Sequence, residues 1–248
     1  MEDLTLYNGG MTLAPAKDLS SRALAAVQQV ASLRQTAKNW PDGHPSKSAL
    51  LAVKSWQAKR LATTYTDLLN NPRYVDAANF FLNDLYGAHD LSARDDEVKR
   101  MLPSLVKLLP NSALRTVVEA LEMDALSEQL DHDLAVELQA NAPSAIGDVA
   151  EMPEAYAYCY RNMPNLERRA EQIAMVAKIG HSLDKLVRQP MLGGLLSAMS
   201  GPAKIAGLSR VYDFLWRGFS AFKKMKGAKE FLEAIEAREI AEDKRLRG

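Results

Sequence analysis

The densest group of side chains with chemical potential lies between Tyr86 and Asp95, where a glycine and a short turn separate two helical patterns. His89 titrates near neutrality, and Asp90 and Asp95 can accept hydrogen bonds from Arg94 or from backbone N–H groups. Two interpretations stay open. Tyr86, His89 and Arg94 bind a ligand together, or these polar groups satisfy backbone groups that are freed where two helices meet. The second is the commoner use of such side chains.

Three tyrosines and the single cysteine occur together in the segment AYAYCYRN. Tyr156 and Tyr160 are one helical turn apart and share a face. They either line an aromatic pocket or interface, or they pack in the core with their hydroxyls bonded at its edge, and the core is the favoured interpretation. Cys159 is not expected to act as a nucleophile, because no histidine is close in sequence and apolar burial raises the pKa of a thiol.

The expected helix Leu166–Arg188 begins with two arginines, Arg168 and Arg169. The helix macrodipole disfavours cations at this end unless an acceptor compensates them. Glu171 and Gln172 are three residues further on and can supply that acceptor, as can acids of another helix.

The same helix contributes to a possible ligand pocket. Asp184 forms an i,i+4 pair with Arg188, or a structural ion pair with Arg161 or Arg168. Alternatively, Arg161 or Arg168 binds a small anion in a bidentate manner. The ligand-binding candidates of this pocket are Tyr160, Arg161, Arg168 and Asp184.

Glu128, Asp131, His132 and Asp133 form an acidic cluster. Glu128 and His132 are at i,i+4 spacing and would hold a metal if another helix supplied ligands. Such clusters are more often solvated faces, and that is our expectation here.

The motifs of the common enzyme classes do not occur in this sequence. No histidine has a glutamate three positions before it, which excludes the di-iron bundle signature. H-E-x-x-H, paired-cysteine zinc spacings, G-x-S-x-G and the glycine-rich phosphate and dinucleotide loops are also missing. We therefore expect neither a catalytic residue of these classes nor a metal nor a cofactor, although other enzyme chemistry stays open.

The composition is typical of a globular protein. Of 248 residues, 47% are hydrophobic and 25% charged, and the 31 basic residues balance 31 acidic ones. Zero net charge argues against coating nucleic acid or an anionic membrane. One cysteine, the acidic start MEDLTLYNGG and the lack of an apolar run long enough to span a membrane indicate a cytoplasmic protein.

Apolar residues recur at helical spacing along almost the whole chain, which predicts an all-α bundle of nine or ten helices. Residues 1–16 are expected to be a disordered tail and 17–248 one domain, with a possible subdomain split near 141–153. A proline should kink or split the fourth helix at Pro103, and Gly201-Pro202 should open a new helix. The helix expected from Ser112 to about Gln139 carries two apolar stripes, which a five-residue step separates. The first is Leu114, Val117, Val118 and Leu121, and the second is Leu126, Leu130, Leu134 and Leu138. The step predicts a change of packing partner along this helix.

The last part of the chain alternates basic and acidic residues between Lys223 and Arg247, which is typical of an exposed helix with many ion pairs. The Gly- and Met-rich stretch Met191–Met199 is a candidate contact surface, because methionine adapts to different partners. Filling of the core is the alternative.

The segment FFLNDLY, Phe80–Tyr86, resembles the signature of the proteobacterial FFLEELY-motif proteins at five of seven positions. Asn83 and Asp84 replace the two glutamates. The stretches YRN…LERRAEQI…LDKLVRQP and GLSRVYDFLWRGFSAFKKM are similar to that family too, so the resemblance covers most of residues 70–240. It implies a bacterial cytoplasmic protein and no particular activity, cofactor or site residue.

Two functions therefore stay open. The leading hypothesis is a non-enzymatic helical interaction or scaffold protein that self-associates or binds a protein partner. The alternative is a small-molecule pocket within the bundle, with a small anionic ligand.

Overall fold

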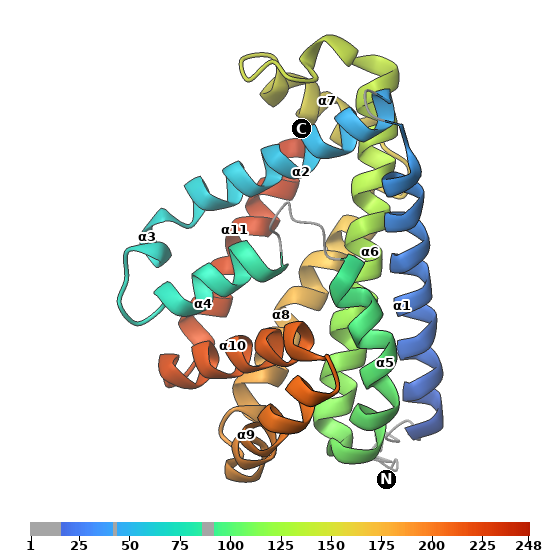
Figure 1. Ribbon diagram of the computed structural model, residues 1–248. Coiled ribbons are helices and arrows are strands. Elements are labelled where there is room, and N and C mark those ends of the chain that lie inside the picture. The colour runs from blue at the N-terminus through green and yellow to red at the C-terminus, as the bar shows by residue number, and fades with distance from the viewer. Residues whose placement is uncertain (1–15, 42–43, 86–91) are drawn as a thin grey trace, which may run out of the picture.

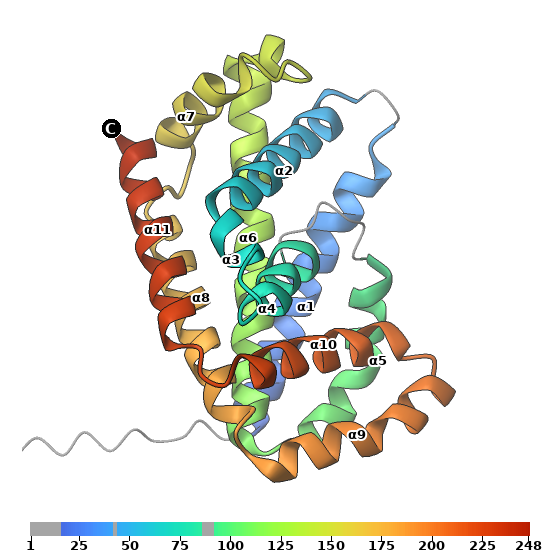
Figure 2. The same ribbon diagram turned by 90° about the vertical axis from the view of Figure 1, so that its left-hand side faces the viewer.

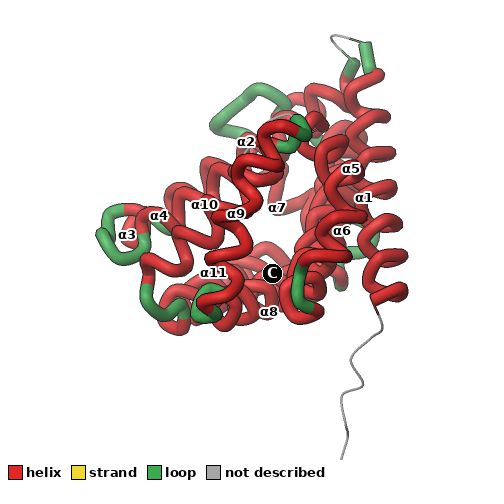
Figure 3. Tube along the Cα trace, turned by 60° about the horizontal axis from the view of Figure 1, so that its bottom comes forward, coloured by secondary structure: helices red, strands yellow, loops and turns green. Residues whose placement is uncertain are grey.

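The computed structural model describes residues 16–41, 44–85 and 92–248, with side chains from 18–41, 44–84 and 96–248. Of the described residues 85% are helical and none lies in a β-strand. Figure 3 shows helices joined by short loops throughout the described ranges. The prediction of an all-α bundle is confirmed.

Eleven α-helices occur in the described ranges, and the π-helical turns Phe80–Leu85 continue the fourth (Figure 1). A short 3₁₀ turn, Pro143–Ala145, follows the sixth. The α-helices are α1 Ala16–Asn39, α2 Pro45–Thr64, α3 Thr66–Leu69, α4 Val75–Asn79, α5 Ser92–Leu108, α6 Asn111–Asn141, α7 Met152–Asn162, α8 Arg168–Leu186, α9 Pro190–Ile205, α10 Ser209–Met225 and α11 Lys229–Arg247.

The longest helix, α6, connects the two parts of the core. Near its start, Leu114 and Val118 pack with α1 and α5. Further along, Leu130 and Leu134 pack with α2 and α7. The change of packing partner between the two apolar stripes is therefore confirmed. In Figure 2, α6 runs behind α2 from the α7 end of the molecule to the α9 end.

Helices α8 and α11 run side by side (Figures 1 and 2). Both contribute residues to the cavity described in the next subsection. Gly180 of α8 allows this close approach, because a Cβ at this position would collide with Leu232 of α11. The two helices therefore stand nearer to each other than larger residues would permit. This spacing fixes the wall of the cavity to which both helices contribute.

The segment with the FFLNDLY resemblance packs through its two phenylalanines. The ring of Phe80 lies against Gly218 and against Phe214, 5.2 Å between ring centroids. Phe81 is also buried and meets the ring of Tyr65 edge-on. Leu82, the next residue, is only half-buried.

Several helix boundaries differ from the predicted ones. Of the two outcomes predicted at Pro103, a kink or a split, the split does not occur, because α5 continues through this residue. Likewise α9 continues through Gly201-Pro202, and the chain turns instead at Gly207, whose φ of +65° is left-handed. The helical chain from Pro45 to Leu69 is interrupted at Tyr65, which separates α2 from α3.

Candidate functional site

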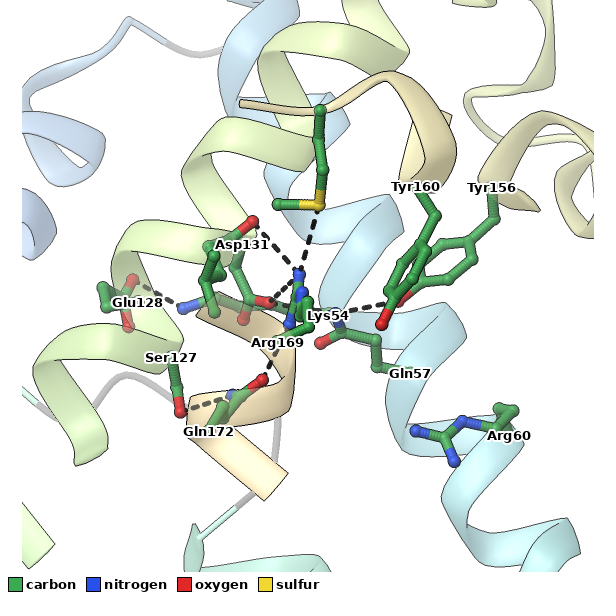
Figure 4. A network of polar contacts seen from close by, with 12 residues as sticks. Lys54, Gln57, Arg60, Ser127, Glu128, Asp131, Tyr156, Tyr160, Arg169 and Gln172 are labelled. Atoms are coloured by element: carbon green, nitrogen blue, oxygen red, sulfur yellow. Dashed lines mark hydrogen bonds and ion pairs between the residues drawn. The ribbon is translucent and has the colours of Figure 1, made fainter. Parts of the chain in front are cut away.

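A cavity of about 100 Å³ is lined mainly by α2, α6, α7, α8 and α11, with Arg34 of α1 and Phe81 of the π-helical turns, and its wall is rich in charged side chains. Figure 4 shows the polar network on this wall. The polar lining residues are Arg34, Lys54, Gln57, Arg60, Asp124, Ser127, Glu128, Asp131, Tyr156, Tyr160, Arg169, Gln172, Glu236, Glu239, Glu242 and Asp243.

Arg169, in the first turn of α8, lies at the centre of this network (Figure 4). Its side chain is only 6% exposed. Nη1 donates to Oε1 of Gln172 at 3.1 Å, Nη2 donates to the carbonyl of Leu130 at 3.2 Å, and Nη2 lies 3.8 Å from Oδ1 of Asp131. Nε has no hydrogen-bond partner among the described residues. A buried donor without an acceptor costs free energy, so this group is suited to receive one.

Gln57 of α2 connects α6 with α7 on the same wall. Its Nε2 donates to Oδ1 of Asp131 at 2.9 Å and to the hydroxyl of Tyr156 at 3.1 Å. The Tyr156 hydroxyl therefore accepts from Gln57 and keeps its own proton to donate. Burial raises the pKa of Tyr156 and that of Asp131, although the nearby charge of Arg169 opposes both shifts.

Glu128 of α6 is 4% exposed and is held by two cations. Lys54 Nζ lies 2.7 Å from its Oε1 and Arg34 Nε lies 3.2 Å from its Oε2. Burial alone would raise the pKa of Glu128, but the charges of Lys54 and Arg34 hold it below its ordinary value. The expectation of a solvated face is therefore wrong for Glu128 and for Asp131, which belong to the interior network.

The helix α11 closes the cavity and contributes four acids to its wall, of which Glu239 and Asp243 bind residues of α2 and α7. Arg60 binds Glu239 with two hydrogen bonds of 2.7 and 2.9 Å, and Tyr65 donates to the same carboxylate at 2.6 Å. Tyr160 donates to Asp243 at 2.6 Å. The ion pairs expected for this exposed helix are present, but Glu239 and Asp243 face the bundle instead of solvent.

The structure brings only one of the four pocket candidates to the cavity. Tyr160 lines it. Arg161 is exposed and donates to the carbonyl of Leu246, Arg168 binds Glu171 at 3.1 Å, and Asp184 binds Arg188 and the backbone N–H of Ala228. The neighbouring Arg169 lines the cavity, whereas Arg161 and Arg168 do not.

The candidate site between Tyr86 and Asp95 falls largely outside the described residues. Tyr86 and His89 lie outside the described residues, and the side chain of Arg94 does too, although its backbone belongs to α5. Ligand binding by Tyr86, His89 and Arg94 therefore stays a prediction.

The remaining sequence expectations concern Cys159 and metal binding. Cys159 is fully buried, and burial raises the pKa of its thiol to about 11, as expected for an inert cysteine. Within the part of the chain that the structure describes, no group of three or more His, Cys, Asp or Glu side chains is arranged to hold a metal ion.

Sequence reasoning missed the polar face of α2. Lys54, Gln57 and Arg60 recur every three residues and all line the cavity. Their spacing was a usable signal, since three and four residues apart on a helix means one face. Polar residues in such a pattern normally face solvent, so only the neighbouring helices identify this face as internal.

The fold and the cavity define the class of protein: an all-α bundle with a polar internal site. A family model described as "Domain of unknown function (DUF8198)" matches residues 36–247, and the chain belongs to this family. The match includes every polar lining residue of the cavity except Arg34. Comparison with curated proteins and with solved structures gives no match. Among the described helices, none combines the length and the apolar character needed to cross a membrane.

Proposed function

We propose that this protein binds a small molecule carrying an oxyanion, a carboxylate or a phosphate, in the central cavity. The observation that carries the proposal is the Nε–H of Arg169, a buried donor with no acceptor among the described residues. The Tyr156 hydroxyl, with its own proton free to donate, supplies a second donor on the same wall. An oxygen acceptor placed between such donors gains charge-assisted hydrogen bonds in a site of low dielectric.

The shape of the site supports a small ligand. A cavity of about 150 Å³ accommodates benzene, so one of about 100 Å³ suits roughly four to six non-hydrogen atoms. Phe81 and Ile235 also line the cavity, so part of its wall is apolar.

A thermal-shift series with acetate, propionate and inorganic phosphate tests the proposal. A ligand at 100 times its Kd should raise the Tm of the wild-type protein by about 5–10 °C. Arg169→Gln should abolish the rise. Arg168→Gln is the matched control, because Arg168 is adjacent on α8 and binds the exposed Glu171 instead of lining the cavity.

A second pair of variants keeps the test valid if Arg169→Gln does not fold. Tyr156→Phe removes the hydroxyl and keeps the buried ring, whereas Tyr158→Phe changes an exposed tyrosine of the same helix. Only Tyr156→Phe should weaken the shift. Equal shifts in all four variants, or none in the wild-type protein with any of the anions, would refute the proposal.

We propose self-association as a second function, on a separate observation. The side chains of Met191 and Ile205 on α9 are 73% and 91% exposed. Lys204 is the single charged residue in this helix. Leu192 and Leu196 on its other face are buried in the core, so α9 is firmly held. Sedimentation at increasing concentration should give a dimer that Ile205→Glu converts to a monomer; a wild-type monomer at all concentrations contradicts this.

The cellular setting belongs to the proposal too. The FFLNDLY segment, with its similarity to FFLEELY-motif proteins, and the single cysteine support a bacterial cytoplasmic protein.

The polar network, which joins α2 and α6 to α7, α8 and α11, supports one domain over residues 17–248 instead of a split near 141–153. Cell fractionation and limited proteolysis test these two points.

A further inference from the structure

The charges of the cavity wall are unequal in number. Seven lining residues are acidic and four are basic. A ligand with an oxyanion alone would therefore enter a site whose surroundings carry an excess of negative charge, and this excess opposes its binding. A ligand that also carried a cationic group would not meet this cost.

Nearly all of the lining acids already have partners. Glu128 has Lys54 and Arg34, and Glu239 has Arg60. Glu242 binds Arg245 and Asp243 binds Arg247, both from α11 itself. Asp124 binds Arg34, and Asp131 accepts from Gln57.

Glu236 is the exception. Among the described residues it is the one lining carboxylate for which no hydrogen bond or ion pair is found. It is half-buried, whereas Arg169 is almost fully buried. The cavity therefore has a buried cationic donor without an acceptor and, nearer to solvent, a carboxylate without a partner.

We propose that the ligand is a small zwitterion, an amino acid or a related amino carboxylate, whose carboxylate binds Arg169 and whose ammonium group binds Glu236. This inference rests on the proposed function, since it assigns the second group of the same ligand. The carboxylate points inward and the ammonium group points toward solvent. Substituents next to the ammonium group can extend out of the cavity, so the ligand class includes amino acids larger than the buried volume.

Isothermal titration with matched compounds tests the assignment. Glycine, β-alanine and 4-aminobutyrate are each compared with the carboxylate that lacks the amino group, acetate, propionate or butyrate, and with the corresponding alkylamine. At least one zwitterion should bind about tenfold or more tightly than its carboxylate, and the amines should not bind measurably.

The outcomes separate this inference from the proposed function. If carboxylates bind as tightly as zwitterions, the zwitterion inference is overturned and the oxyanion site stands. If amines bind as tightly as zwitterions, the carboxylate contributes nothing and the zwitterion inference is overturned. If no compound of the three series binds, the zwitterion inference is overturned as well, and the proposed function falls with it when inorganic phosphate also gives no thermal shift.

A pair of variants on α11 locates the ammonium group. Glu236→Gln should lower the affinity for the zwitterion about three- to tenfold and should not lower that for the carboxylate, because it removes a negative charge from the wall. Glu233→Gln is the control, because Glu233 is exposed and pairs with Lys229. Equal effects of the two substitutions would contradict the role of Glu236.

Discussion

The guanidinium of Arg169 lies over the ring of Tyr160, with its Cζ 5.5 Å from the ring centroid. The same tyrosine donates its hydroxyl proton to Asp243 of α11. Tyr160 therefore holds the arginine from one side by a cation–π contact and ties α7 to α11 from the other. The orientation of Arg169 depends on packing between three helices that are distant in sequence.

Replacing Tyr160 by phenylalanine should separate these two roles. Tyr160→Phe keeps the ring against Arg169 and removes the donor to Asp243, which should lower the free energy of unfolding by about 1–3 kcal/mol. Denaturant unfolding measures the loss. Tyr158→Phe, on the exposed side of the same helix, should change it by less than about 0.5 kcal/mol. A Tyr160→Phe variant as stable as the wild-type protein would show that this hydrogen bond is unimportant.

Two glycines within helices should respond oppositely to alanine. In Gly180→Ala the new Cβ meets the buried Leu232, and overpacking of about 1–3 kcal/mol outweighs the gain of about 1 kcal/mol in helix propensity. At Gly194 nothing lies within 4 Å of the new Cβ, so Gly194→Ala should stabilise the protein by about 0.5–1 kcal/mol. Paired thermal and denaturant unfolding measure both. Equal stabilisation would show that α8 and α11 are not closely packed at Gly180.

The stability should fall on acidification through His132. Burial lowers the pKa of His132 below its ordinary value of 6.5, although Glu128, Asp131 and Asp133 oppose this and Lys54 reinforces it. A depressed folded-state pKa means that the unfolded chain takes up the proton first. The stability that neutral His132 contributes to the folded protein is therefore fully present above pH 6.5. It is lost as the pH falls toward the folded-state pKa of His132.

The measurement is Tm between pH 5 and 8 for the wild-type protein and for His132→Gln. The wild-type Tm should drop more steeply below pH 6.5 than that of the variant, which has no group to protonate at this position. Parallel curves would contradict the assignment of this pH dependence to His132.

The thiol of Cys159 should be inert in the folded protein. Burial, and secondarily the charge of Glu137, raises its pKa to about 11, so almost no thiolate exists at pH 8. Labelling with iodoacetamide at pH 8 should be negligible under native conditions and complete in denaturant. Rapid labelling of the native protein would mean that α7 opens locally.

The fold was predictable because periodicity is a local property of the chain. Residues such as Leu130 and Leu134 recur at helical spacing and are fully buried, as expected. Helix ends were less predictable at prolines. Pro202 lies within α9, where the loss of one N–H donor on an exposed turn does not end the helix, and Gly207 ends it instead.

The site was only partly predictable. The sequence predicts that Tyr156 and Tyr160 share a face, and both are buried. Of the acceptors that the sequence left open for Arg169, Gln172 is one that the structure shows. Whether a polar residue faces solvent or a cavity depends on the helices packed against it. From the sequence, Lys54, Gln57 and Glu128 are therefore expected at the surface. The packing of α2 against α6 places all three on the wall of the cavity.

The most direct test of the account is the NMR signal of the Arg169 Nε–H group during titration with an amino carboxylate, assigned by its loss in Arg169→Lys. A buried Nε–H that acquires an oxygen acceptor should move downfield in proton shift with the same saturation curve that calorimetry gives. Acetate should move it in the same direction at higher concentration. A signal that stays in place while the ligand binds would contradict the account, because the ligand would then bind elsewhere.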